Sequence, residues 1–177
     1  EEVEELSDIF DGSGPVAAII GGAKVSTKIK LLNHLSKTMD TLIIGGAMAN
    51  TFLYAQGHNI GKSKCEKDMK KTALTILKNA EKRGCNVVLP VDLVVTEEFR
   101  AHTPCRVVDV GNIPPEGTAA DVGPASVSLF AQEVAKCKMV VWNGPLGAFE
   151  TSPFDASNTT LARMVAKLTS DKKVRSI

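Results

Sequence analysis

Aromatic residues are scarce in this sequence, at 5% of 177 residues, and acidic and basic side chains nearly cancel to a net charge of +1. Basic stretches with interleaved aromatics, on which single-stranded nucleic acids stack, are absent. Apolar stretches of the roughly 20 residues that span a bilayer are also absent, and the acidic beginning is unlike a signal or transit peptide. This composition therefore gives no support for a nucleic-acid or membrane partner. We also expect the protein to be a cytoplasmic monomer.

Cysteine and histidine are too dispersed to suggest a metal site. The four cysteines, Cys65, Cys85, Cys105 and Cys137, are scattered singly, with no C-x-x-C pair. A zinc site or a thioredoxin-like motif is therefore not predicted, and we interpret the cysteines as reduced thiols. The three histidines are equally isolated, so we assign them structural roles and predict no metal ligand in this chain.

Two common nucleotide-binding signatures are missing. The sequence contains neither G-x-G-x-x-G after a strand nor G-x-x-x-x-G-K-[ST]. Their absence argues against an ordinary dinucleotide-dependent dehydrogenase and against a P-loop NTPase.

Short apolar runs alternate with helical patterns along the chain. Strand-like runs occupy residues 16–20, 41–44, 86–89 and 139–142, and another begins at 174–177. Helical patterns occupy residues 25–37, 48–56, 66–83, 127–134 and 159–169. Residues 106–110 read as an accessory strand outside the main sheet, and residues 112–124 read as a loop. The strands are apolar on both faces, which predicts a Rossmann-like α/β fold, a three-layer α/β/α parallel sheet over residues 15–177.

Unusual residues follow the ends of the predicted strands. They are Gly21-Gly22, Gly45-Gly46, Pro90-Val91-Asp92 and Asn143-Gly144-Pro145. The carboxyl ends of parallel strands share one edge, and ligands bind in the crevice outside it. These four segments therefore predict a single binding site.

The first of these segments leads into two lysines, Lys24 and Lys28. If a helix begins at residue 25, the lysines lie on one helical face beside a turn whose amides suit an anion. A phosphate between the lysines and a tight turn with two solvated lysines fit this pattern about equally well.

Five segments, taken in order, resemble those of the phosphoglycerate kinase family. They are IIGGAKVSTK at residues 19–28, IIGGAMANTF at 43–52, LPVD at 89–92, DVGP at 121–124 and VWNGPLGAFE at 141–150. The last is the most specific, and together they extend over most of the chain.

The resemblance implies the C-terminal, nucleotide-binding domain of an enzyme that transfers a phosphoryl group from 1,3-bisphosphoglycerate to Mg-ADP, giving 3-phosphoglycerate and ATP. Residues 1–14 then match the end of an interdomain helix and its linker. The family holds phosphoglycerate on an N-terminal domain that this sequence does not include. The sequence also stops before the family's Gly-Gly-Gly-Asp-Thr segment, which carries the magnesium aspartate. We therefore expect a C-terminally truncated domain, inactive on its own.

The resemblance also assigns roles to individual residues. Lys24 matches the lysine that stabilises the phosphoryl group in flight, Lys28 a lysine on the nucleotide phosphates, and Asn143 an amide on the phosphate side. Glu150 matches the carboxylate on the ribose hydroxyls. The remaining positions surround the adenine or lie beside the nucleotide: Gly22, Ala23, Gly46, Ala47, Phe99, Pro145 and Ala148.

Some positions depart from the family pattern. Ala47 replaces a frequent glycine, Ala119-Ala120 replace bulkier residues, and Ser157-Asn158 replace a common Gly-Thr. Two alternatives are a nucleotide-dependent oxidoreductase with an atypical glycine turn and a non-catalytic binding module. Trp142 and Asp92 read as structural, and Phe99 as equally suited to the core or to a ligand.

Overall fold

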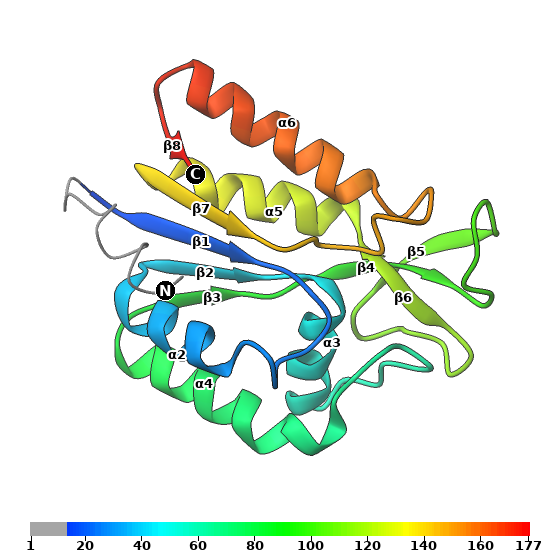
Figure 1. Ribbon diagram of the computed structural model, residues 1–177. Helices are drawn as coiled ribbons and strands as arrows, with labels where there is room; N and C mark the ends of the chain where they lie inside the picture. Colours follow the sequence, from blue (N-terminus) through cyan, green and yellow to red (C-terminus); the bar gives the residue numbers. More distant parts are fainter. Residues whose placement is uncertain (1–13) are drawn as a thin grey trace.

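The computed structural model describes residues 14–177, which form two β-sheets flanked by helices (Figure 1). The larger sheet has the strand order β3-β2-β1-β7-β8, and all its pairings are parallel. Its strands are β1 (Val16–Ile20), β2 (Thr41–Ile44), β3 (Asn86–Val88), β7 (Met139–Asn143) and β8 (Arg175–Ser176). Except for its last residue, the predicted helix end and linker of residues 1–14 lie outside the described residues.

Helices cover both faces of the larger sheet (Figure 1). On one face lie α2 (Ile29–Thr38), α4 (Lys70–Lys82) and most of the apolar surface of α3 (Gly46–Ala55). On the other lie α5 (Pro124–Ala135) and α6 (Ala156–Ser170). The predicted three-layer α/β fold is therefore confirmed.

The strand β1 shows why its sequence requires two helical layers. Ala18 and Ile20 pack into the cluster beneath α2 and α4, whereas Ala17 and Ile19 pack into the cluster beneath α5 and α6. None of the four side chains is more than 1% exposed. Side chains alternate between the faces of a strand, so a strand apolar at every position must be covered on both sides.

A second, antiparallel sheet stands beyond the carboxyl edge of the first (Figure 1). It contains β5 (Cys105–Asp109), β4 (Asp92–Thr96) and β6 (Thr118–Val122) in the order β5-β4-β6. The prediction that residues 106–110 lie outside the main sheet is confirmed. The prediction of a loop over 112–124 is wrong in part, because residues 118–122 form a strand, and β4 was not predicted at all.

Helix boundaries differ from the predictions at two places that bear on the site. The helix predicted from residue 25 begins only at Ile29. In the turn before it, Lys28 N donates to Val25 O at 2.9 Å, and the backbone N–H and the hydroxyl of Ser26 both donate to the Glu66 carboxylate. The helix predicted over 66–83 starts as a short 3₁₀ turn, η1 (Lys67–Met69), before α4.

A buried carboxylate joins the second sheet to the helix α5. Asp92, 3% exposed, accepts hydrogen bonds from Ser126 N at 2.8 Å, Ser126 Oγ at 2.6 Å and Ala125 N at 3.0 Å. These are donors of the first helical turn, which have no partner within the helix itself. The structural role predicted for Asp92 is confirmed.

Candidate functional site

Three loops at the carboxyl edge of the larger sheet are bonded to one another through their backbones. Gly22 N donates to Pro145 O at 3.0 Å, and Gly46 N donates to Leu146 O at 2.8 Å. Met48 N, in the first turn of α3, donates to Gly22 O at 2.9 Å. The glycine segments predicted to converge therefore do so, and they share a continuous hydrogen-bonded surface.

The close approach of these loops requires glycine. Gly46 has a φ of +69°, and a Cβ there would lie 2.6 Å from Gly22 N and 2.9 Å from Pro145 O. Real side chains do not tolerate contacts this short with backbone atoms, and L-residues rarely adopt such a φ. Residue 46 must therefore be glycine for the loops that contain Gly22 and Pro145 to approach it this closely.

A cavity of about 530 Å³ opens beside these loops and extends to the strand β6. Eight of the eleven predicted site residues line it: Gly22, Ala23, Gly46, Ala47, Phe99, Pro145, Ala148 and Glu150. The volume lies in the range typical of pockets for small molecules and cofactors. Residues separated by more than 120 positions in sequence therefore share one cavity.

The other three predicted residues lie outside the cavity lining. The Nζ of Lys28 donates to Asn143 Oδ1 at 2.6 Å and to Gly21 O at 3.2 Å, which joins the loops after β1 and β7. Lys24 is exposed on the loop that precedes α2. The prediction that Lys24 and Lys28 share a helical face is wrong, because both precede the first helical residue, Ile29.

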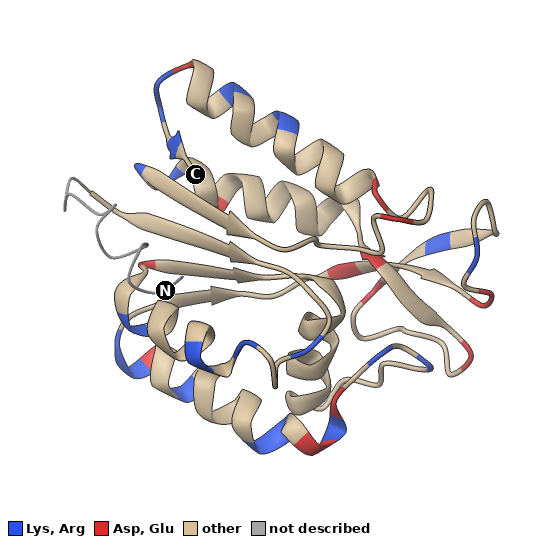
Figure 2. Ribbon diagram, in the orientation of Figure 1, with Lys and Arg blue, Asp and Glu red and all other residues tan. Residues whose placement is uncertain are grey.

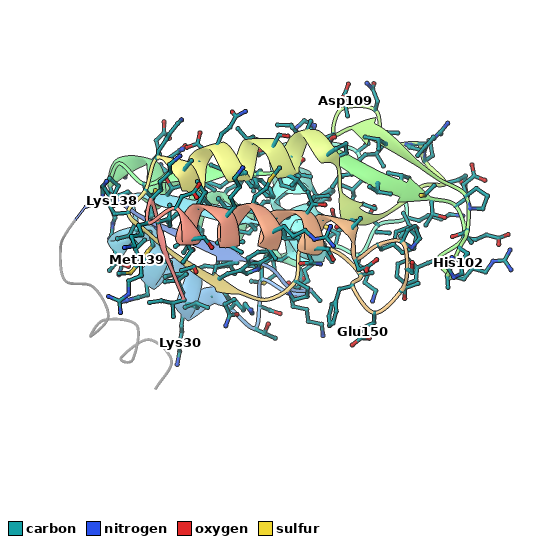
Figure 3. The ribbon with its side chains drawn as sticks, turned by 90° about the horizontal axis from the view of Figure 1, so that it is seen from above. Lys30, His102, Asp109, Lys138, Met139 and Glu150 are labelled. Atoms are coloured by element: carbon teal, nitrogen blue, oxygen red, sulfur yellow. The ribbon has the colours of Figure 1, made fainter. Side chains whose placement is uncertain are left out.

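Phe99 contacts a buried aromatic residue and also borders the cavity. Its ring stacks on the fully buried Phe154, with centroids 5.6 Å apart and an interplanar angle of 16°. The residue also lines the cavity, and 51% of its surface is exposed. Glu150 lies on the loop between β7 and α6 (Figure 3), is exposed, and is one of the residues that line the cavity.

Asp121 is a cavity residue to which sequence reasoning assigned no role, although it opens the quoted DVGP segment. It is 4% exposed and accepts hydrogen bonds from Ser157 Oγ, from Ser157 N at 3.1 Å and from Val122 N at 2.8 Å. Burial raises the pKa of Asp121 from 3.8 to about 6, against the opposing effect of these hydrogen bonds. The carboxylate thus holds the start of α6 beside the cavity.

Sequence reasoning also missed the wall contributed by residues 62–64. Lys62 and Lys64 line the cavity, and Asn50, on α3, lines it too and donates to Lys64 O at 3.1 Å. The hydroxyl of Ser63 accepts a hydrogen bond of 2.8 Å from Ala119 N. The small side chains at Ala119 and its neighbour Ala120, which depart from the family pattern, form the facing wall.

The charges near the site fall into two groups (Figure 2). Basic residues lie on the loop between β1 and α2 and on the cavity wall of residues 62–64, and acidic residues lie on the second sheet where β4 and β6 approach the larger sheet. Within residues 14–177, no three His, Cys, Asp or Glu side chains gather in a way that could hold a metal ion. The helices described in that range are too short or too polar to cross a membrane.

A family model described as phosphoglycerate kinase matches residues 1–177. The chain is 53% identical over 169 residues to the phosphoglycerate kinase of Granulibacter bethesdensis, a match that covers 95% of this chain and 43% of that protein. It is 47% identical over 177 residues to the phosphoglycerate kinase of Xanthobacter flavus, covering 99% of this chain and 45% of that protein.

The solved structure of phosphoglycerate kinase from Coxiella burnetii has the same fold. It superimposes with a TM-score of 0.88 at 40% sequence identity, over 94% of this chain and 43% of that one. The chain therefore spans less than half the length of the relatives it matches. No oxidoreductase stands among these relatives, so the oxidoreductase alternative gains no support, and the chain belongs to the phosphoglycerate kinase family.

Proposed function

We propose that this chain is the C-terminal, nucleotide-binding part of a phosphoglycerate kinase. In this proposal it binds ADP or ATP and takes part in phosphoryl transfer from 1,3-bisphosphoglycerate to ADP, giving 3-phosphoglycerate and ATP. The observation that carries the proposal is the cavity itself. Segments assigned to the nucleotide by family resemblance, and scattered over residues 22–150, line one cavity of about 530 Å³.

The arrangement suits a nucleotide that lies across the strand ends. Glycine and alanine at Gly22, Ala23, Gly46 and Ala47 leave room for a flat base against the backbone. Phe99 offers a half-exposed ring at the cavity wall, and the Glu150 carboxylate at the rim can accept hydrogen bonds from ribose hydroxyls.

The phosphates would then extend toward the loop of residues 22–28. The Lys28 ammonium, held by Asn143 and by Gly21 O, supplies positive charge at a fixed position between two loops. In this proposal the exposed Lys24 neutralises charge on the phosphoryl group in transfer. Phosphoryl transfer depends mainly on such positioning and charge neutralisation and needs no covalent intermediate on the protein.

Magnesium would bind together with the nucleotide. In sites of this kind, Mg²⁺ is usually held by the substrate phosphates, by water and by only one or two carboxylates. Residues 14–177 offer no cluster of three candidate metal ligands. The chain spans about 43% of the length of the Granulibacter bethesdensis relative, and we expect no kinase activity from these 177 residues alone.

Nucleotide binding can be tested directly on the 177-residue protein by NMR titration with ADP. We expect amide shifts to cluster in residues 21–28, 45–50, 118–123 and 143–151. The single tryptophan, Trp142, provides a fluorescence signal, since its indole N–H donates to Gly144 O at 2.8 Å beside the site. Shifts centred elsewhere would contradict the proposal, and combining Glu150→Ala with Lys28→Ala should abolish the binding.

Catalysis can be tested in a chimera in which this sequence replaces the matching 43% of the Granulibacter bethesdensis relative. We expect the chimera to form ATP from 1,3-bisphosphoglycerate and ADP. Lys24→Ala should lower its rate by about 10²–10³, as expected for a group that stabilises developing charge. A loss of less than about tenfold would reduce Lys24 to a surface lysine, and detectable turnover by the 177-residue chain would contradict its expected inactivity.

A further inference from the structure

Residues 62–66 form a brace between the helix α3 and the second sheet. Lys62 N donates to Gly117 O at 2.8 Å, and Ser63 Oγ accepts from Ala119 N. On the other side, Glu66 N donates to Thr51 Oγ1 at 3.1 Å, and Thr51 is fully buried in α3. This brace, defined by residues 62–66, is therefore fixed at both of its ends.

The Glu66 carboxylate extends from the brace to the loop of residues 22–28. Its Oε2 accepts a hydrogen bond from Ser26 N at 3.1 Å, and its Oε1 accepts one from Ser26 Oγ. Glu66 thus holds both the backbone and the side chain of the residue two positions after Lys24. The two partners are 40 residues apart in sequence, so this is a tertiary contact rather than a local cap.

The loop has few other restraints on this side. Because α2 begins only at Ile29, none of residues 22–28 has the full set of helical hydrogen bonds. Val25 is buried and Thr27 Oγ1 donates to Lys24 O at 3.0 Å, but the latter contact lies within the loop. The two ends of the loop are fixed by Gly22, which accepts from Met48 N, and by Lys28, which donates to Asn143 Oδ1. Between these ends, the loop is held to the rest of the protein by the buried Val25 and by the bonds of Ser26 to Glu66.

The charge state of Glu66 is consistent with its hydrogen bonds to Ser26. Burial acts to raise the pKa of Glu66, but hydrogen bonds from Ser26 and the Val25 backbone, together with the charge of Lys24, lower it overall. The carboxylate is therefore ionised at neutral pH, and the Lys24 ammonium lies close enough to interact with it.

We propose that Glu66 is a positioning residue for the phosphoryl-transfer end of the site, which it serves by clamping Ser26 and so setting the place of the Lys24 ammonium. This inference rests on the proposed function, since it assigns Lys24 to the terminal phosphate. It adds a residue from outside the strand-end loops. Glu66 does not touch the nucleotide in this scheme and acts only through the loop.

The test compares the affinities of the 177-residue protein for ADP and for ATP, each with Mg²⁺. Glu66→Gln should leave ADP affinity within about twofold and weaken ATP about tenfold, since small displacements of a positioning group have large effects. The same change in a Lys24→Ala background should have no further effect on ATP. A role that is only structural would weaken both nucleotides alike and would act independently of Lys24.

Two further variants keep the test decisive. Ser26→Ala removes one of the two donors to Glu66 and retains the backbone bond, so it should give a smaller ATP-specific loss even if Glu66→Gln folds poorly. Glu133→Gln is the matched control, because Glu133 is a half-buried carboxylate on α5 that accepts from Asn86 Nδ2 at 3.2 Å and Lys136 Nζ at 3.0 Å. It should change neither affinity.

The possible failures are distinguishable. If the unmodified chain binds no ADP, the proposed function falls and this inference falls with it. If ADP binds but the ratio of ATP to ADP affinity is the same in Glu66→Gln, Ser26→Ala and the unmodified chain, the inference alone is overturned.

Discussion

The Nζ of Lys28 donates a hydrogen bond of 2.6 Å to Oδ1 of Asn143, 115 residues away in sequence. The contact joins the loop after β1 to the end of β7, two strands that are neighbours in the sheet. It also fixes the amide of Asn143 with its oxygen toward the lysine, so its NH₂ group faces away from that ammonium and can donate to an anion. A pair of donors arranged in this way suits a phosphate group.

We expect Lys28→Ala to weaken ADP binding by about tenfold, because hydrogen bonds to charged groups contribute roughly 1.5–3 kcal/mol. Binding of adenosine, which lacks phosphates, should stay unchanged. Isothermal titration of both ligands measures the difference. Lys30→Ala serves as the control, since Lys30 is an exposed lysine on α2 (Figure 3). An equal loss for adenosine would place Lys28 away from the phosphates.

The meeting of strand ends could be predicted from sequence because it depends on local patterns. Apolar runs such as Val16–Ile20 define buried parallel strands, and parallel topology then brings their carboxyl ends together. The second sheet could not be predicted in the same way. The strand β6 (Thr118–Val122) contains two alanines and an aspartate, and its pairing with β4 is interrupted by an irregularity between Val94 and Val95.

The predicted start of α2, at residue 25, was wrong for a different reason. The pattern of Val25, Ile29 and Leu32 is helical, and it is correct from Ile29 onward. Residues 25–28 form a turn instead, in which Lys28 N donates to Val25 O and Ser26 bonds to Glu66, 40 residues further along the chain. Tertiary context of this kind routinely overrides local propensity, and residues 62–64 of the brace that carries Glu66 also form the cavity wall that sequence reasoning missed.

We expect Gly46→Ala to destabilise the fold by more than about 2 kcal/mol. Gly57→Ala should cost only about 1 kcal/mol, because residue 57 also has a positive φ, of +97°, but its Cβ would meet no atom within 4 Å. The pair therefore separates the cost of backbone strain from the cost of the clash with Gly22 and Pro145. Urea unfolding of both variants checks this, and equal losses would show that the loops separate without cost.

Asp121 should make stability depend on pH. Its pKa is raised from 3.8 to about 6 by burial, so the folded state binds this proton more tightly than the unfolded state. The stabilisation that protonated Asp121 contributes to the folded state is fully present below about pH 4 and is lost as the pH rises toward and through 6. At roughly 1.4 kcal/mol for each tenfold change in proton affinity, the loss is on the order of 2–3 kcal/mol.

Comparing the unmodified protein with Asp121→Asn isolates this contribution from that of other carboxyls. The free energy of unfolding of the unmodified protein, relative to the asparagine variant, should fall between pH 4 and pH 7. Chemical denaturation at several pH values measures it. A difference that stays constant over this range would mean that the hydrogen bonds from Ser157 and Val122 outweigh burial.

The buried carboxylate of Asp92 attaches the second sheet to α5. Asp92→Ala should destabilise the protein by about 2–4 kcal/mol, because it leaves the buried donors Ser126 N and Ser126 Oγ, and the less buried Ala125 N, without their carboxylate acceptor. Asp109→Ala is a matched control: Asp109 pairs with Asp92 in the register of β4 and β5 but is exposed. Exposed substitutions of this kind usually change stability by less than about 0.5 kcal/mol.

The location of the damage distinguishes this role from a general loss of packing. Hydrogen exchange should quicken first in the opening turn of α5 and in β4, because Asp92 joins these two elements, while β1 and β2 keep their protection. The cavity should loosen with them, since Leu93, next to Asp92 on β4, forms part of its lining. If Asp92→Ala and Asp109→Ala unfold at the same denaturant concentration, the second sheet is held by its apolar contacts, and the buried carboxylate contributes little to its attachment.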